Sequence, residues 1–414
     1  MRPASLSCLL ASAALVLGAA SPGFAANDPL APAGVGAPPA TAPVKPVIET
    51  LHGMKVTDNY RYMEKLDPAT IGWMKSQGAY TRKVLDAIAP LAALRKRVSA
   101  FTGSFGFVQG YVSYGGRAFY EERQPGADDF DLLVRDRQGT RKLLDIAALR
   151  RQHGGKPYAI NWFLASPDGG KVAVGISEGG SENAELTVYD AASGKRVAGP
   201  IERVMFGATA WSDDSGTVFF NQLQAVKPDQ PESDKYLDST LYAWNLKSAP
   251  AAVLGTRAGH GPKFEPQEFP ALGIVPGAPL AAAISINGVQ NEIESWLAPA
   301  GHAADAGATW RPFVARDDDV TGFDMRGDRI FLLSHKDAPT FKVLELKAGE
   351  PLSSARTLVA ARPDRVIERI AAASDALYVL ARKGAYSQLL RIPTGGSEAE
   401  AVELPFEGHI GEAF

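Results

Sequence analysis

The chain has 414 residues, of which 45% are hydrophobic, so it is long enough to bury a large core in one big domain with appendages. Its 43 basic and 46 acidic residues give a formal net charge of -3, and no local basic cluster stands out. Anionic partners such as nucleic acid and membrane surfaces bind to positively charged protein surfaces, so we expect neither as a partner.

The first 26 residues have the pattern of a secretory signal peptide. Arg2 supplies the positive start, Leu9 to Ala20 the apolar core, and Phe24-Ala25-Ala26 the cleavage site. The apolar run is too short for a comfortable membrane span. The sequence therefore predicts export, to the periplasm or as a secreted protein. The single cysteine, Cys8, lies inside this segment, so the processed chain would contain no thiol.

The segment after the signal predicts a linker followed by helices. Residues 27–46 are rich in Pro, Ala and Gly, which predicts a disordered linker, and residues 48–64 are expected to be irregular. Asp67-Pro68 is typical of a helix start, because an N-cap residue precedes Pro at the first helical position. The expected helix reaches about Ala89, and a second short helix follows Pro90, giving a helical segment over residues 47–100. The apolar face of the first helix consists of Trp73, Gln77, Tyr80, Val84 and Ile88.

The rest of the chain repeats one sheet unit, which is clearest in residues 161–190. Residues 162–165 predict a short strand, a Ser-Pro-Asp-Gly turn follows, and residues 171–177 and 184–190 predict two further antiparallel strands. The same order of parts recurs with inner turns spaced about 50 residues apart, as expected of a repeat architecture. These turns lie at Gly115, Asp168, Ser215, Gly277, Gly327 and Asp375. The sequence thus predicts an all-β fold, a β-propeller over residues 101–414 with about six blades, preceded by the short helical segment.

Four stretches carry motifs that are more specific than the repeat. They are His52-Gly53 with Val56, Asp58 and Tyr60 to Glu64; Trp73 to Leu85; Phe119 to Asp136; and Ser177 to Asp190. In this order they resemble the opening signature, the following helix and the first two blades of the prolyl oligopeptidase family of serine peptidases. Asn59 stands where that family usually has Pro, and Tyr62 where it usually has Trp.

The resemblance implies a propeller of the seven-bladed type that caps an α/β-hydrolase domain with a Ser, an Asp and a His. Such enzymes cut short peptides after proline or another preferred residue, and the propeller filters substrates by size. In the family the hydrolase domain follows the propeller in sequence, and none follows it here. We therefore expect a propeller that is incomplete at its C-terminus, inactive alone, and partnered by a hydrolase domain in cis or in trans.

One serine motif could suggest catalysis within the chain itself. Gly175 to Gly179 fits the pattern G-x-S-x-G around Ser177, and His153-Gly154-Gly155 resembles a Gly-rich oxyanion run. The pattern requires a strand-to-helix turn at the serine, whereas here a Gly-rich loop leads into an alternating strand. We interpret both motifs as parts of a blade hairpin and predict no catalytic residue.

Metal and cofactor signals are also weak. No two of the six histidines have metal-ligand spacing. The acidic runs Glu121-Glu122 and Asp317-Asp318-Asp319 are more typical of solvated turns and strand edges than of cation sites. The sequence predicts neither a metal nor a cofactor.

One substrate-binding residue follows from the resemblance. Val204 to Trp211 resembles the family segment whose Phe projects towards the substrate cleft, which implies that Phe206 contributes to an apolar subsite. The alternative is that Phe206 belongs to the core of the third blade. Full enclosure of its ring between two blades would exclude the subsite.

Whether the propeller closes distinguishes two hypotheses, an incomplete peptidase propeller and a complete stand-alone one. If the seven-fold spacing is kept, a gap separates the blade at Phe119 from the blade at Tyr378, and residues 407–414 reach into it as an isolated strand or frayed tail. If six blades suffice, those two blades pack directly and bury Ile410 and Phe414 at the seam. The second arrangement would favour a stand-alone exported propeller that acts as a binding or scaffold module.

Overall fold

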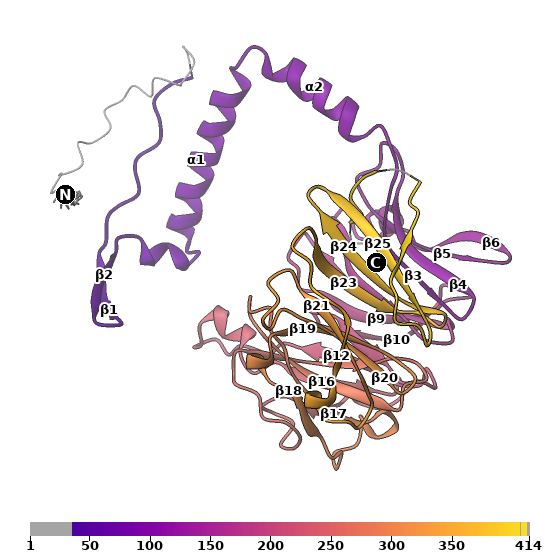
Figure 1. Cartoon of the computed structure of the whole chain (residues 1–414). Helices are drawn as coiled ribbons and strands as arrows, with labels where there is room; N and C mark the ends of the chain where they lie inside the picture. Colours follow the sequence, from indigo (N-terminus) through magenta and orange to yellow (C-terminus); the bar gives the residue numbers. More distant parts are fainter. Residues whose placement is uncertain (1–34, 406, 412–414) are drawn as a thin grey trace, which may run out of the picture. The chain divides into compact units, whose positions relative to one another are not determined.

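The computed structural model describes residues 35–405 and 407–411 (Figure 1). The chain divides into two compact units, Met1–Ser104 and Phe105–Phe414, and each is described by itself. The predicted signal peptide and residues 27–34 of the predicted linker lie outside the described residues. Residues 35–46 form no helix or strand.

A β-hairpin opens the first unit, in the region that the sequence analysis expected to be irregular. Strands β1 (Val47–Leu51) and β2 (Met54–Asp58) pair antiparallel around a two-residue turn, and the turn residues His52 and Gly53 have φ of 50° and 81°. Positive φ at both turn positions matches the twist of a tight hairpin. The expectation was wrong because the pairing depends on this turn and on Arg61, whose guanidinium donates to Glu49 at 2.8 Å and 3.1 Å.

Two helices complete the described part of this unit. Helix α1 (Pro68–Asp86) begins as predicted, because the side chain of Asp67 accepts a hydrogen bond from the Thr70 N–H at 2.7 Å. It ends three residues before Ala89, so Ile88 lies in the turn ahead of α2 (Leu91–Thr102). Proline disfavours helical backbone at the residue before it, and Pro90 therefore ends α1 early. Neither these helices nor any other in the described residues is long and apolar enough to cross a membrane.

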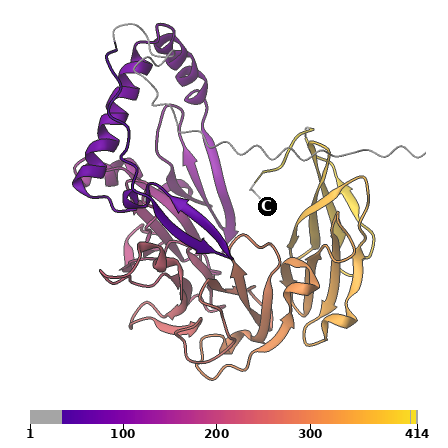
Figure 2. The same ribbon diagram turned by 90° about the vertical axis from the view of Figure 1, so that its left-hand side faces the viewer.

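Six antiparallel sheets of four strands form the second unit, as predicted for a propeller (Figures 1 and 2). The first three sheets contain β3 (Phe107–Tyr114), β4 (Arg117–Arg123), β5 (Asp131–Asp136) and β6 (Gly139–Leu144); β7 (Tyr158–Ala165), β8 (Lys171–Glu178), β9 (Glu185–Asp190) and β10 (Arg196–Ile201); and β11 (Ala208–Trp211), β12 (Val218–Gln222), β13 (Thr240–Trp244) and β14 (Ala251–Leu254). Helix α3 (Ile146–Gln152) connects the first sheet to the second.

The last three sheets follow the same plan. They contain β15 (Glu268–Ile274), β16 (Leu280–Asn287), β17 (Glu294–Pro299) and β18 (Arg311–Val314); β19 (Val320–Arg326), β20 (Arg329–Ser334), β21 (Lys342–Lys347) and β22 (Arg356–Val359); and β23 (Val366–Ala372), β24 (Ala376–Lys383), β25 (Tyr386–Pro393) and β26 (Glu400–Val402). The sequence predicts three strands per unit but not the fourth, outer strand. Four of these strands have only three or four residues, and exposed or half-buried positions fill β10 and β26, so they lack a clear alternation.

Five hydrophobic cores join successive sheets face to face. Between the first and second sheets, Phe119 and Val134 pack against Val172 and Val174. Equivalent clusters join the second to the third, the third to the fourth, the fourth to the fifth and the fifth to the sixth. Burial between sheets, rather than within one sheet, therefore supplies most of the apolar stabilisation.

No sixth core closes the ring in the part of the chain that the structure describes. No hydrophobic cluster, hydrogen bond or ion pair of the described residues joins β23–β26 to β3–β6, and Figure 2 shows these sheets at the two ends of an arc. The described tail forms no strand; instead the Ser387 N–H donates to the Gly408 carbonyl at 2.8 Å, and the Ile410 N–H donates to the Ser387 hydroxyl at 2.8 Å. The tail thus folds back on its own sheet. Phe414 lies outside the described residues.

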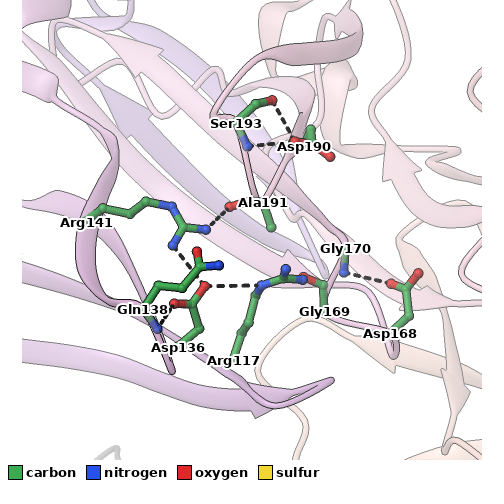
Figure 3. A network of polar contacts seen from close by, with 10 residues as sticks. All are labelled: Arg117, Asp136, Gln138, Arg141, Asp168, Gly169, Gly170, Asp190, Ala191 and Ser193. Atoms are coloured by element: carbon green, nitrogen blue, oxygen red, sulfur yellow. Dashed lines mark hydrogen bonds and ion pairs between the residues drawn. The ribbon is translucent and has the colours of Figure 1, made fainter.

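Polar contacts near the inner turns hold neighbouring sheets in register (Figure 3). Arg117 of β4 donates to the Gly169 carbonyl at 2.8 Å, and Arg141 of β6 donates to the Ala191 carbonyl at 2.6 Å, so two guanidinium groups of the first sheet bind backbone of the second. Arg141 also pairs with Asp136 at 2.9 Å, and this hydrogen bond holds the pKa of Asp136 below its usual range.

Candidate functional site

Phe206 lies in the connection between β10 and β11, at the end of the sheets where the inner strand β11 begins. Its ring is 47% exposed and meets the Phe269 ring edge-on, with centroids 4.5 Å apart. The ring is therefore not enclosed between two sheets, and the condition that would have excluded an apolar subsite is not met. Its role in substrate binding stays a prediction.

Trp162 fixes the loop that carries Phe206. Its indole N–H donates to the Val204 carbonyl at 3.0 Å. A Cβ placed on Gly207 would lie 3.1 Å from the indole, and one placed on Gly175 would lie 2.2 Å from it. The indole is thus held close to two glycine backbones, one in the loop and one in β8, and the absence of side chains there lets the ring approach.

The exposed apolar surface continues onto the fourth sheet. Phe269 of β15 pairs directly with Ile286 of β16, and directly opposed residues of an antiparallel pair share one face of the sheet. Ile286 is itself exposed. We call Phe206, Phe269 and Ile286 the apolar platform. The sequence does not predict Phe269 and Ile286 as site residues, because nothing local distinguishes them from core residues of a strand.

Ser177 does not occupy a nucleophile elbow. It lies within β8, opposite Ala159 of β7, and the chain continues through a turn into β9 rather than into a helix. Its side chain is only 2% exposed, and its hydroxyl has no hydrogen-bond partner. His153 packs against the Tyr158 ring with centroids 5.4 Å apart. The serine motif therefore has the hairpin geometry that we predicted for it.

Glu121 corrects the interpretation of the first acidic run. We expected a solvated edge, but Glu121 is 7% exposed, because its position in β4 puts it on the same face as the core residue Phe119. Burial raises its pKa, while the hydrogen bond from Gln109 Nε2 at 3.0 Å opposes that rise. In the second run, the carboxylate of Asp318 accepts from the Ala315 N–H at 2.9 Å.

The described residues contain no group of three or more His, Cys, Asp or Glu side chains that could hold a metal ion. His335 Nε2 lies 2.8 Å from Glu292, and His302 Nδ1 lies 2.8 Å from Asp305, so each of these two histidines pairs with one carboxylate.

Comparison with known proteins identifies the family. A model of the N-terminal β-propeller domain of prolyl oligopeptidase matches residues 39–252 and 282–411. The chain belongs to the prolyl oligopeptidase family. The resemblance drawn from its sequence motifs is thereby confirmed, as is the propeller.

Solved structures of prolyl oligopeptidases have the same fold. One, from an analysis of two prolyl endopeptidases, is 22% identical to this chain with a TM-score of 0.76, and the match covers 89% of this chain and 53% of that one. Another, prolyl oligopeptidase B from Galerina marginata bound to a 35-residue hydrolysis and macrocyclization substrate, is 13% identical with a TM-score of 0.74, covering 89% and 55%. At these identities the likeness concerns the fold alone. The chain spans about half the length of these proteins.

Proposed function

We propose that this chain is the N-terminal and propeller part of a prolyl-oligopeptidase-like serine endopeptidase that acts on short peptides. In this proposal the propeller controls access of the peptide, and a hydrolase domain in cis or in trans supplies Ser, Asp and His. The observation that carries the proposal is the apolar platform, which is exposed where the family segment implies substrate contact. Aromatic rings bind apolar and prolyl side chains well because they bury a large area.

The platform suits a peptide ligand for a physical reason. Trp162 holds the loop on either side of Phe206, at the Val204 carbonyl and against Gly207, so binding does not have to order the loop. A preorganised site loses less entropy on binding. All three platform residues are uncharged and apolar. We therefore expect contacts with apolar side chains rather than with peptide charges.

The test is peptide binding to the full chain. A fluorescein-labelled proline-containing octapeptide should bind, as measured by anisotropy, and Phe206→Ala should weaken binding at least about fivefold, since burying an aromatic ring contributes about 1–2 kcal/mol. Tyr386→Ala is the matched control, because Tyr386 is 53% exposed in the sixth sheet and is not part of the platform. Equal affinity of the Phe206→Ala variant and the unaltered chain would exclude a role for the platform.

The chain alone should not cleave a proline-containing chromogenic peptide. The one G-x-S-x-G serine is buried in a β-strand, so it lacks the exposed position that a nucleophile needs. Any cleavage by the chain alone would contradict this part of the proposal, and Ser177→Ala would show whether Ser177 is responsible for it.

We also propose that residues 1–26 direct export. Their charge and apolar pattern support this, and they lie outside the described residues. A fusion of residues 1–26 to alkaline phosphatase, which is active only outside the cytoplasm, should be active, and Leu9→Arg with Leu10→Arg should abolish that activity. An inactive fusion, or one that the two arginines leave unchanged, would count against export.

A further inference from the structure

A cavity of about 460 Å³ lies between the fifth and sixth sheets, at the inner-turn end of the strands. Its lining includes the β19–β20 turn at Gly327 and the β25–β26 connection at Gly395. Each inner strand runs from the end that carries the platform to the inner-turn end, so the cavity and Phe206 lie at opposite ends of the strands. A ligand here would not compete with a peptide on the platform.

Arg326 gives this cavity its chemical character. Its guanidinium lies 5.3 Å from the centroid of the Phe331 ring and donates one hydrogen bond to the Ala373 carbonyl at 3.2 Å. No carboxylate of the described residues lies within ion-pair distance of it. A guanidinium has five N–H donors, so several remain for a ligand while the ring and the carbonyl hold the group in place.

The other charged groups of the lining compensate one another. Glu345 is buried and pairs with both Arg329 and Arg356, and the exposed Asp328 lies 3.9 Å from Arg329. Three guanidinium groups, counting Arg326, therefore face two carboxylates. The excess positive charge belongs to Arg326, and it favours an anionic ligand.

The rest of the lining combines the hydroxyl residues Ser374 and Thr394 with apolar side chains. The side chains of Phe331 and Leu377 belong to the core between the two sheets, and Leu358 and Pro393 are half-buried beside them. Cavities of a few hundred Å³ that combine apolar walls with a few polar groups are typical of small-molecule sites. We propose that this cavity binds a small amphipathic carboxylate, with its apolar body against Leu358 and Pro393 and its carboxylate on Arg326.

The experiment uses the full chain and a matched pair of probes, 3-phenylpropionate and its neutral amide, titrated by calorimetry at constant ionic strength. The carboxylate should bind at least about tenfold more tightly than the amide, because a charge-assisted hydrogen bond contributes more than a neutral one. Acetate, which has the charge but no apolar body, should also bind at least about tenfold more weakly than 3-phenylpropionate.

Variants locate the binding. Arg326→Gln should reduce the affinity for 3-phenylpropionate at least about tenfold. Arg135→Gln should leave it unchanged; Arg135 is the matched control because its guanidinium also lies over an aromatic ring, 5.8 Å from the Tyr111 centroid, but in the first sheet. The proposal is wrong if 3-phenylpropionate shows no binding at about 10 mM, because a ligand of this size that gains about −0.3 kcal/mol per atom binds in the millimolar range. It is also wrong if the amide and the carboxylate bind equally, or if the Arg326→Gln variant binds 3-phenylpropionate as tightly as the unaltered chain does. The probe pair keeps the test decisive even if Arg326→Gln does not fold.

Discussion

Gly175→Ala tests how the platform is held in place. A methyl group at this position would lie 2.2 Å from two atoms of the Trp162 indole, far inside van der Waals contact. The indole would have to move away from β8, and this movement would strain or break its hydrogen bond to the Val204 carbonyl. Trp162 also packs in the core between the second and third sheets, so its displacement affects the fold as well as the loop.

The expected cost follows from these contacts. Overpacking of this kind typically costs about 1–3 kcal/mol, and a lost hydrogen bond adds about 1 kcal/mol, so the variant should lose about 2–4 kcal/mol of unfolding free energy. Urea unfolding followed by circular dichroism measures this loss. In a thermal melt it should lower the Tm by at least about 3 °C, since 1 kcal/mol shifts the Tm of a unit as large as Phe105–Phe414 by only about 1.5 °C. Gly175→Ala should also lower the affinity for the labelled peptide, as Phe206→Ala does.

Ser177→Ala, two residues further along the same strand, is the control. It removes a buried hydroxyl that has no hydrogen-bond partner, so the free energy of unfolding should stay unchanged or rise by up to about 1 kcal/mol. If Gly175→Ala unfolds within about 0.5 kcal/mol of the unaltered chain, the indole is not fixed against Gly175 and the account of the loop is wrong.

Three further variants probe other contacts. Burial raises the pKa of Glu121 above its usual value, so the folded state binds the Glu121 proton more tightly than the unfolded state does. Stability therefore falls as pH rises from the unfolded pKa through the folded pKa. Glu121→Gln should be neutral near pH 4 and stabilising at pH 8, as compared by Tm. Arg141→Gln should cost about 0.5–1.5 kcal/mol of unfolding free energy by removing a contact between sheets, whereas Arg137→Gln, at an exposed position of the same sheet, should cost nothing measurable. Leu94→Lys with Phe101→Lys on the exposed face of α2 should reduce self-association measured by light scattering, and unchanged scattering would count against an associating surface.

Local signals predicted those parts of the fold that local interactions stabilise. The inner turns were found from Ser, Asp and Gly because the turn is built by these side chains themselves: the Ser166 hydroxyl donates to Asp168 at 2.6 Å, and the Gly170 N–H donates to the same carboxylate at 2.8 Å. The start of α1 was found for a similar reason, since Asp67 caps it within the same turn.

Features that depend on distant residues were not found. Gly175 was read as part of a serine motif, although its lack of a side chain serves the packing of Trp162 on the neighbouring strand. Glu121 was read as solvated, because only the pairing of β4 with its neighbours shows which face it occupies. The platform residues Phe269 and Ile286 required the register of β15 and β16. Strand pairing and packing determine the environment of these residues, and a short stretch of sequence does not reveal either.

Strand alternation determines which side chains the first sheet presents on the side away from the second sheet. Phe119 faces the second sheet, so Tyr120 must face the opposite way, towards the side that no described sheet covers. Tyr111 stacks on Tyr120 with centroids 5.9 Å apart, and Arg135 donates to the Tyr111 hydroxyl at 3.0 Å. The face is therefore aromatic, with one guanidinium over it. Tyr120 is itself only 8% exposed, so this face has the burial as well as the composition of an interior surface.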